Sequence, residues 1–124
     1  MKICIIGTGY VGLVSGACFA DLGNTVYCVD KDHNKIDMLN EGQIPIYEPG
    51  FNEIVNKNYL SNRLKFTTNL SLAVKSSDLI FICVGTPTSK KNKSADLRYV
   101  FKAASDIGNH INKFKIIVTK STVP

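Results

Sequence analysis

A glycine-rich turn and an aspartate near the N-terminus have the residue types and spacing that bind a phosphate and a ribose. The pattern Gly7-Thr-Gly9-Tyr-Val-Gly12 directly follows an apolar run at residues 3–6, and Asp30 follows a second apolar run at residues 25–29. Glycines in this setting let a helix N-terminus approach a pyrophosphate, and the carboxylate accepts hydrogen bonds from ribose hydroxyls. The pattern therefore predicts a dinucleotide site. Asp30 favours NAD, because it would repel the 2′-phosphate of NADP.

Each glycine has a separate task in this prediction. Gly7 permits the turn after the strand, Gly9 lets the pyrophosphate approach the backbone, and Gly12 lets the helix pack closely on the sheet. The same pattern also occurs in ordinary turns, so the prediction depends on the strand before it and the helix after it. Lys31 leaves the cofactor preference open, since a cation beside Asp30 weakens the discrimination against NADP.

Composition places the chain among soluble globular domains. Its 124 residues suffice for one domain with a core, and 44% of them are apolar while 20% are charged. No apolar run approaches the roughly 20 residues of a membrane span, so we expect a cytoplasmic protein without a membrane partner. The net charge is +5. No basic helix with interleaved aromatic residues accompanies that charge, so we expect an anionic small ligand rather than nucleic acid.

The four cysteines give no sign of metal binding or of nucleophilic chemistry. They form no pair with metal-ligand spacing, and each lies in an apolar stretch, at Cys4, Cys18, Cys28 and Cys83. We therefore expect no metal site. We also expect all four thiols to be reduced, buried and unactivated.

Apolar runs and helix-period patterns alternate along the chain, which is typical of an α/β fold. Strands are expected at residues 3–6, 25–29, 64–67, 79–84 and 116–119. Helices are expected at residues 11–22, at 33–40 after the cap Asp32, at 51–59, and at 70–75 after the cap Asn69. A last long helix has an apolar face at Leu97, Val100, Phe101, Ala104, Ile107 and Ile111. Right-handed crossovers then give a Rossmann-type, doubly wound parallel sheet in three layers, with the strand order 3-2-1-4-5.

In that order the first and fourth strands are neighbours whose helices lie on opposite faces, and ligands bind beyond such strand ends. We therefore expect the segments after the fourth and fifth strands to meet the glycine-rich turn in one crevice. The threonines of these segments serve either as cofactor hydrogen-bond partners or as caps and turn formers. Lys35 is either a solvated lysine or an adenosine contact. The candidates after the fourth and fifth strands are Gly85, Thr86, Pro87, Ser121 and Thr122.

Four segments stand out in order along the chain. They are Ile6-Gly-Thr-Gly-Tyr-Val-Gly-Leu13, Ile44-Pro-Ile-Tyr-Glu-Pro-Gly50, Val84-Gly-Thr-Pro-Thr88 and Lys120-Ser-Thr-Val-Pro124. Together they resemble the N-terminal domain of the nucleotide-sugar dehydrogenases, at that family's spacings and over the whole chain. The full Pro-Ile-Tyr-Glu-Pro-Gly form looks most like the UDP-glucose 6-dehydrogenase branch. The alternatives within the family are the GDP-mannose and UDP-N-acetylhexosamine enzymes.

The resemblance implies an NAD-dependent, two-step oxidation of the C6 alcohol of UDP-glucose to the carboxylate of UDP-glucuronate, a step of nucleotide-sugar metabolism and polysaccharide biosynthesis. It also implies a role for each matching residue. The implied contacts are Gly7, Thr8, Gly9, Tyr10, Val11 and Gly12 at the pyrophosphate, Asp30 and Lys35 at the adenosine, and Thr86 and Thr122 nearer the nicotinamide.

The resemblance further implies that the chemistry lies outside this chain. In the family the nucleophilic cysteine and its helper residues follow the Ser-Thr-Val-Pro motif, so no catalytic residue is expected in residues 1–124. We expect residues 1–124 to be an N-terminal NAD-binding fragment of a homodimeric enzyme, without the sixth strand, the central helix and the sugar-nucleotide-binding C-terminal domain. A free-standing NAD-binding regulatory module and a Rossmann domain for S-adenosylmethionine or flavin are the alternatives from other classes.

Overall fold

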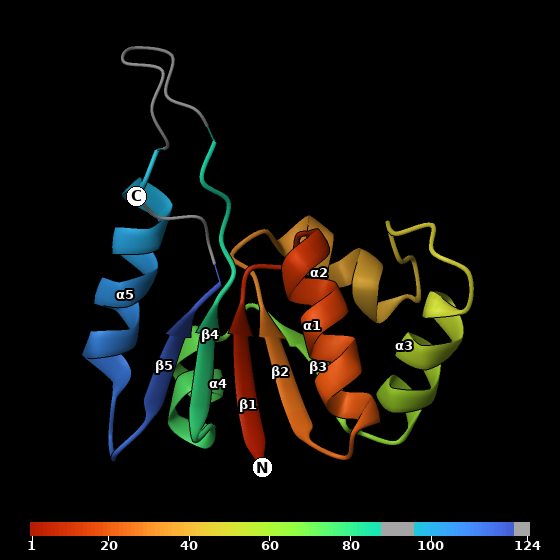
Figure 1. The fold of residues 1–124 in the computed structure, drawn as a ribbon, viewed down its shortest axis with the longest axis horizontal. Helices are drawn as coiled ribbons and strands as arrows, with labels where there is room; N and C mark the ends of the chain where they lie inside the picture. The colour runs from red at the N-terminus through yellow and green to blue at the C-terminus, as the bar shows by residue number, and fades with distance from the viewer. Residues whose placement is uncertain (88–95, 121–124) are drawn as a thin grey trace.

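The computed structural model describes residues 1–87 and 96–120. Its centre is a five-stranded parallel sheet with the strand order β3-β2-β1-β4-β5 (Figure 1). The predicted doubly wound sheet and its strand order are therefore confirmed. The strands are β1 (Lys2–Ile6), β2 (Thr25–Val29), β3 (Leu64–Thr67), β4 (Leu79–Ile82) and β5 (Ile116–Thr119).

Helices cover both faces of the sheet and complete the three layers. The helices α1, α2 and α3 lie on one face, and α4 and α5 lie on the other (Figure 1). The side chains of each group pack in a separate core cluster. The described helices are α1 (Tyr10–Asp21), α2 (His33–Asn40), α3 (Phe51–Leu60), α4 (Leu70–Ser76) and α5 (Arg98–His110).

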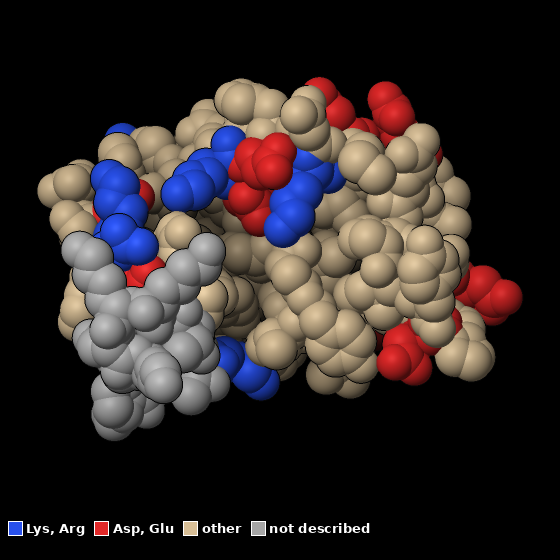
Figure 2. Space-filling view, turned by 90° about the horizontal axis from the view of Figure 1, so that it is seen from above, with Lys and Arg blue, Asp and Glu red and all other residues tan. Residues whose placement is uncertain are grey.

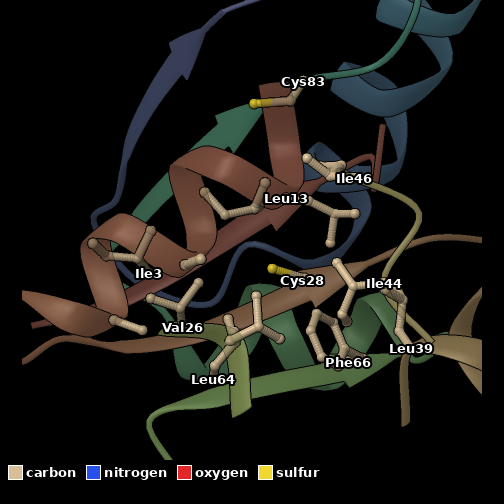
Figure 3. Packing of buried hydrophobic residues seen from close by; sticks show 14 of the residues in the cluster. Ile3, Leu13, Val26, Cys28, Leu39, Ile44, Ile46, Leu64, Phe66 and Cys83 are labelled. Carbon is tan, nitrogen blue, oxygen red and sulfur yellow. The ribbon is translucent and has the colours of Figure 1, made fainter. Parts of the chain in front are cut away.

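The central strand β1 is buried on both of its faces. Ile3 and Ile5 belong to the cluster shared with α1, while Cys4 and Ile6 belong to the cluster shared with α4 and α5. Successive side chains of a strand point to opposite faces, so a strand covered on both sides requires an unbroken apolar run. Figure 3 shows the first of these clusters, where Leu13 of α1 meets side chains from the sheet.

Two helices begin at side-chain caps that the sequence predicts. The Asp32 carboxylate accepts hydrogen bonds from the backbone N–H groups of Asn34 and Lys35, at 3.0 and 3.3 Å, before α2. The Asn69 side chain accepts one from the Leu72 N–H at 3.0 Å, before α4. Each such cap stabilises its helix by about 1 kcal/mol. Both cap predictions are confirmed.

The prediction that all four cysteines are buried is wrong for Cys18, which is exposed. The first helix packs only one face against the sheet, and that face runs through Leu13, Ala17 and Ala20. Consecutive residues of a helix are rotated by about 100°, so Cys18 turns away from the face that Ala17 occupies. Residues 11–22 are thus not buried throughout, and Leu22 at the helix end is exposed.

The buried face of α5 also differs from the predicted one. Val100, Ala103 and Ile107 are buried, at the three- and four-residue spacing of a helix face. The predicted face differs by one position at Ala104, whose neighbour Ala103 is buried instead, because apolar residues occupy both positions. β4 is shorter than predicted and ends at Ile82 rather than at residue 84. The predicted face residues that are exposed instead are Phe101, Ala104 and Ile111.

Within residues 1–87 and 96–120, no helix has the length and apolar character needed to cross a bilayer. The same part of the chain holds no group of three or more His, Cys, Asp or Glu side chains placed to bind a metal ion.

Candidate functional site

The carboxyl ends of β1 and β4 form the topological switch point of the sheet. The two strands are paired neighbours, and the Cys83 N–H donates a hydrogen bond to the Ile6 carbonyl at 2.8 Å. The helix that follows β1 packs on one face, and α5, the helix that follows β4, packs on the other. Ligands of open α/β sheets bind outside such a point. Figure 2 views the molecule from this end and shows acidic side chains flanked by basic ones.

Gly7 and Gly12 are glycines because the protein itself leaves no room for a side chain. Gly7 has φ +106°, and a Cβ on it would lie 2.6 Å from the Cys83 carbonyl oxygen. A Cβ on Gly12 would overlap the Gly7 carbonyl oxygen. The turn after β1 and the close approach of α1 therefore depend on these two residues.

Gly9 differs from both, because no described atom would lie within 4 Å of a Cβ placed on it. It has an ordinary φ of −74° and forms the N-cap of α1. Its carbonyl accepts the first helical hydrogen bond, from the Leu13 N–H at 2.9 Å. No side chain of the described residues caps this helix end, and Tyr10 and Val11 in its first turn are exposed. Free N–H groups and the positive end of the helix dipole make this point suitable for an anion.

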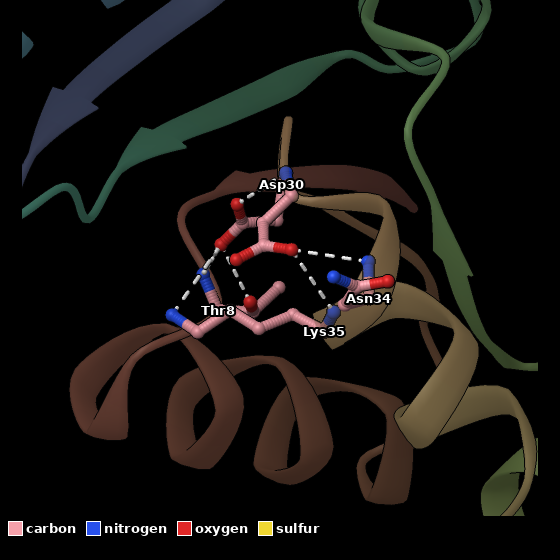
Figure 4. A network of polar contacts seen from close by, with 5 residues as sticks. Thr8, Asp30, Asn34 and Lys35 are labelled. Carbon is pink, nitrogen blue, oxygen red and sulfur yellow. Dashed lines mark hydrogen bonds and ion pairs between the residues drawn. The ribbon is translucent and has the colours of Figure 1, made fainter.

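Asp30 is held at both carboxylate oxygens just after β2 (Figure 4). Its Oδ2 accepts hydrogen bonds from the Thr8 hydroxyl at 2.6 Å and from the Thr8 N–H at 3.2 Å, and the Lys35 ammonium lies 3.8 Å away. Its Oδ1 accepts one from the Asp32 N–H at 3.0 Å. Burial raises the pKa of the Asp30 carboxyl, but these hydrogen bonds and the Lys35 charge outweigh burial, so its pKa lies below the ordinary value. Asp30 is therefore an anion at neutral pH.

The two lysines near Asp30 take different directions. Lys35 forms the ion pair described above, while the ammonium of Lys31 lies over the Tyr99 ring of α5, 5.4 Å from its centroid. Of these two lysines, the one nearer to the Asp30 carboxylate is thus not its sequence neighbour Lys31 but Lys35 in the first turn of α2.

A cleft of about 330 Å³ opens beside the N-terminus of α1. One of its walls is the loop of residues 43–50, which Ile44 and Ile46 anchor in the core. The Tyr10 hydroxyl donates a hydrogen bond to the Glu48 carboxylate at 3.3 Å, and the charge and hydrogen bond of Glu48 raise the pKa of the Tyr10 phenol. The sequence alone assigns no role to Tyr47 or Glu48, and the structure places both in the wall of this cleft. The cleft is lined by Thr8, Gly9, Tyr10, Leu13, Lys35, Pro45, Ile46, Tyr47 and Glu48.

The structure gathers some of the predicted site residues and separates others. Residues 7–12, Asp30 and Lys35 lie together around the N-termini of α1 and α2. Thr86 follows β4 and is half-buried, with Gly85 and Pro87 exposed on either side of it. None of these three lines the cleft. Two further candidates, Ser121 and Thr122, fall outside the described residues.

Three of the cysteines are unsuited to nucleophilic chemistry. Burial raises the pKa of the Cys4 thiol to about 12. It also raises the pKa values of the thiols of Cys28 and Cys83. A thiol with a raised pKa supplies little thiolate at neutral pH, so these residues pack in the core as small apolar groups.

Comparison with known proteins gives a single answer over the whole chain. Residues 1–124 match the UDP-glucose/GDP-mannose dehydrogenase family, NAD binding domain. The chain belongs to this family. UDP-glucose 6-dehydrogenase TuaD of Bacillus subtilis is 58% identical over 123 residues, which are 99% of this chain and 26% of that protein. The chain thus spans about a quarter of the length of this relative.

Solved structures agree in fold and in family. The UDP-glucose dehydrogenase of Pyrobaculum islandicum superposes with a TM-score of 0.91 at 40% identity, over 98% of this chain and 29% of that one. The GDP-mannose dehydrogenase of Pseudomonas aeruginosa, solved as a ternary complex, superposes with a TM-score of 0.93 at 42% identity, over 99% of this chain and 29% of that one.

The site brings together groups that can bind the parts of a dinucleotide. Open space at Gly9 leaves room beside the backbone, where the N-terminus of α1 supplies N–H donors. The ionised Asp30 lies beside it and supplies acceptor oxygens. These groups suit the two parts of a dinucleotide, a pyrophosphate and a ribose diol, in the order in which the cofactor presents them.

Proposed function

We propose that residues 1–124 form the N-terminal NAD-binding domain of a UDP-glucose 6-dehydrogenase, which oxidises UDP-glucose to UDP-glucuronate in two steps. The observation that carries this proposal is the uncapped N-terminus of α1 beside the held carboxylate of Asp30. NAD bound in this domain would supply the hydride acceptor for each of the two oxidations. The domain's part is to bind and orient it. Residues 7–12 hold the pyrophosphate, Asp30 and Lys35 hold the adenosine ribose, and the segments with Thr86 and Thr122 lie toward the nicotinamide.

UDP-glucose is the substrate that sequence similarity favours within this family. Two relatives named UDP-glucose 6-dehydrogenase are 58% and 56% identical to this chain. The GDP-mannose dehydrogenase with a similar fold is 42% identical, so the GDP-mannose enzyme is the alternative. We assign the sugar-nucleotide site and the catalytic cysteine to the part of the relatives that this chain does not cover. We further propose a homodimeric, cytoplasmic enzyme, and we expect the 124-residue protein to bind NAD without turnover.

A calorimetric titration of the 124-residue protein with NAD⁺ and then with NADP⁺ tests the cofactor assignment. We expect NAD⁺ to bind and NADP⁺ to bind more weakly. Asp30→Ala should weaken NAD⁺ binding by about 1–3 kcal/mol, the contribution of hydrogen bonds to a charged group. The same substitution at Asp106, a half-buried, ion-paired residue of α5, serves as the matched control and should leave binding unchanged. A folded sample that binds neither nucleotide would refute the assignment.

A further inference from the structure

Thr8 borders the cleft, but it differs from the other residues of the glycine-rich turn because its side chain is buried against Asp30. It is only 2% exposed, although it lies between Gly7 and Gly9 in a turn at the molecular surface. Its hydroxyl and its N–H both donate to one atom, Oδ2 of Asp30, at 2.6 and 3.2 Å. The two residues are 22 positions apart in the chain, so this contact ties the end of β2 to the turn after β1.

The two oxygens of the Asp30 carboxylate accept different numbers of hydrogen bonds. Oδ2 carries both Thr8 donors and faces the Lys35 ammonium, whereas Oδ1 carries the Asp32 N–H alone. An ionised carboxylate oxygen accepts about two hydrogen bonds. Oδ2 is therefore saturated within the protein, and Oδ1 keeps acceptor capacity for a further donor. Because donors reach both oxygens, the carboxylate is also held against rotation about its own bond to the chain.

We propose that Thr8 is a positioning residue, whose hydroxyl fixes the Asp30 carboxylate so that Oδ1 is kept for a ribose hydroxyl of NAD. Thr8 thereby acts on cofactor preference through Asp30 rather than through the pyrophosphate. This rests on the proposed function, since it assumes that Asp30 binds the ribose. A fixed anion cannot turn aside from a 2′-phosphate. A loosened carboxylate can turn toward Lys35 or solvent, and the repulsion of NADP then falls.

Removing only the hydroxyl tests this role. Thr8→Val keeps the volume of the side chain and deletes the donor, while Thr8→Ser keeps the donor and deletes the methyl group. We expect Thr8→Val to weaken NAD⁺ binding about tenfold, the effect of a lost hydrogen bond to a charged group. NADP⁺ binding should change by less than about twofold, so the preference for NAD⁺ falls. Thr8→Ser should retain the wild-type preference. Calorimetry measures the dissociation constants of NAD⁺ and NADP⁺ for both variants, which are compared with those of the wild type.

A double-mutant cycle separates positioning from direct contact. In an Asp30→Ala background, Thr8→Val should cause no further loss of NAD⁺ affinity, because the carboxylate that Thr8 positions is gone. Equal loss of NAD⁺ and NADP⁺ affinity in Thr8→Val, or additive effects in the cycle, would overturn the proposal. So would an unchanged dissociation constant.

Folding of the variants is checked by circular dichroism before titration. If Thr8→Val does not fold, Thr8→Ala replaces it, since a smaller side chain cannot clash, and the same change in preference is expected. Failure of both to fold, with Thr8→Ser folded, would overturn the positioning role in favour of a structural one. Absence of NAD⁺ binding by the wild-type protein would instead refute the proposed function.

Discussion

The three glycines of the turn differ in whether the protein or the ligand requires them, and matched substitutions separate the two cases. Gly12→Ala places a methyl group on the Gly7 carbonyl oxygen. That carbonyl cannot move aside easily, because the Thr8 N–H in the same peptide unit donates to the Asp30 carboxylate at 3.2 Å. Overpacking costs about 1–3 kcal/mol, and a backbone obstacle places this case near the upper end. At about 4 °C per kcal/mol for a domain of this size, the melting temperature should fall by about 10 °C.

Gly9→Ala should give the opposite result. The added methyl group meets no described atom within 4 Å, and φ of −74° is allowed for alanine. The cost is limited to the poorer capping ability of alanine, at most about 1 kcal/mol. The melting temperature should therefore fall by less than about 4 °C. The methyl group occupies the space that we assign to the pyrophosphate, so NAD⁺ binding should weaken at least about tenfold, or 1.4 kcal/mol.

Gly108→Ala is the matched control for both variants. It is the same substitution within α5, where the added methyl group also meets nothing within 4 Å. Gly108 lies in the last turn of α5, where alanine should raise stability by at most about 0.5–1 kcal/mol and leave NAD⁺ binding unchanged. Differential scanning fluorimetry and calorimetric titration of the three proteins give the comparison. Wild-type affinity in Gly9→Ala, or wild-type stability in Gly12→Ala, would show that the division into ligand-required and protein-required glycines is wrong.

Three further predictions concern charge and reactivity. Asp30→Asn should lower the free energy of unfolding by about 1 kcal/mol at pH 7. Because the pKa of Asp30 is depressed in the folded state, this difference between variant and wild type should shrink as the pH falls below about 4. Urea unfolding curves measure it, and a difference that stays constant with pH would contradict the prediction. Glu48→Gln removes a negative charge from the cleft that Gly9 also lines. Because that charge repels an anionic pyrophosphate, NAD⁺ binding measured by calorimetry should become about twofold stronger. Weaker binding would instead show that Glu48 contacts the ligand. In a thiol-reagent assay the exposed Cys18 should react first and the buried cysteines only on unfolding, and a second fast thiol would contradict the buried core.

The sheet could be predicted from the sequence because parallel topology leaves few solutions. Apolar runs such as residues 3–6 must be covered on both faces, and right-handed crossovers then fix the strand order. The register of α5 could not be predicted as well. Val100 and Phe101 are adjacent apolar residues, and the period alone does not say which of them faces the sheet. Packing on β4 decides it, and the larger ring of Phe101 lies in solvent.

The contacts within the site were the least predictable part. The glycines and Asp30 carried a clear signal, since their types and order belong to a known pattern. The bond between Thr8 and Asp30 depends on how the turn after β1 is directed, and φ +106° at Gly7 sets that direction. The loop of residues 43–50 has no regular structure to predict. Its sequence motif points to a family but not to contacts, and it is the burial of Ile44 and Ile46 that brings Glu48 to Tyr10.

The helix ends show that the open N-terminus of α1 is specific to the site and not a general property of this fold. Side chains of Asp32, Asn69 and Asp96 accept backbone N–H groups at the starts of α2, α4 and α5, and α3 has Glu53 in its first turn. Among the described helices, α1 and α5 have neither a side-chain cap at the N-cap residue nor an acidic residue in the first turn. At α5, however, Asp96 just before the N-cap accepts the Arg98 N–H, so α1 is the described helix that begins without any of these groups. A serine or aspartate in place of Gly9 would supply a capping side chain and raise the free energy of unfolding by several tenths of a kcal/mol or more. The uncapped, positive N-terminal end of α1 thus lowers the stability of the free protein. A bound anion would accept hydrogen bonds from its free N–H groups and supply the stabilisation that a cap gives other helices.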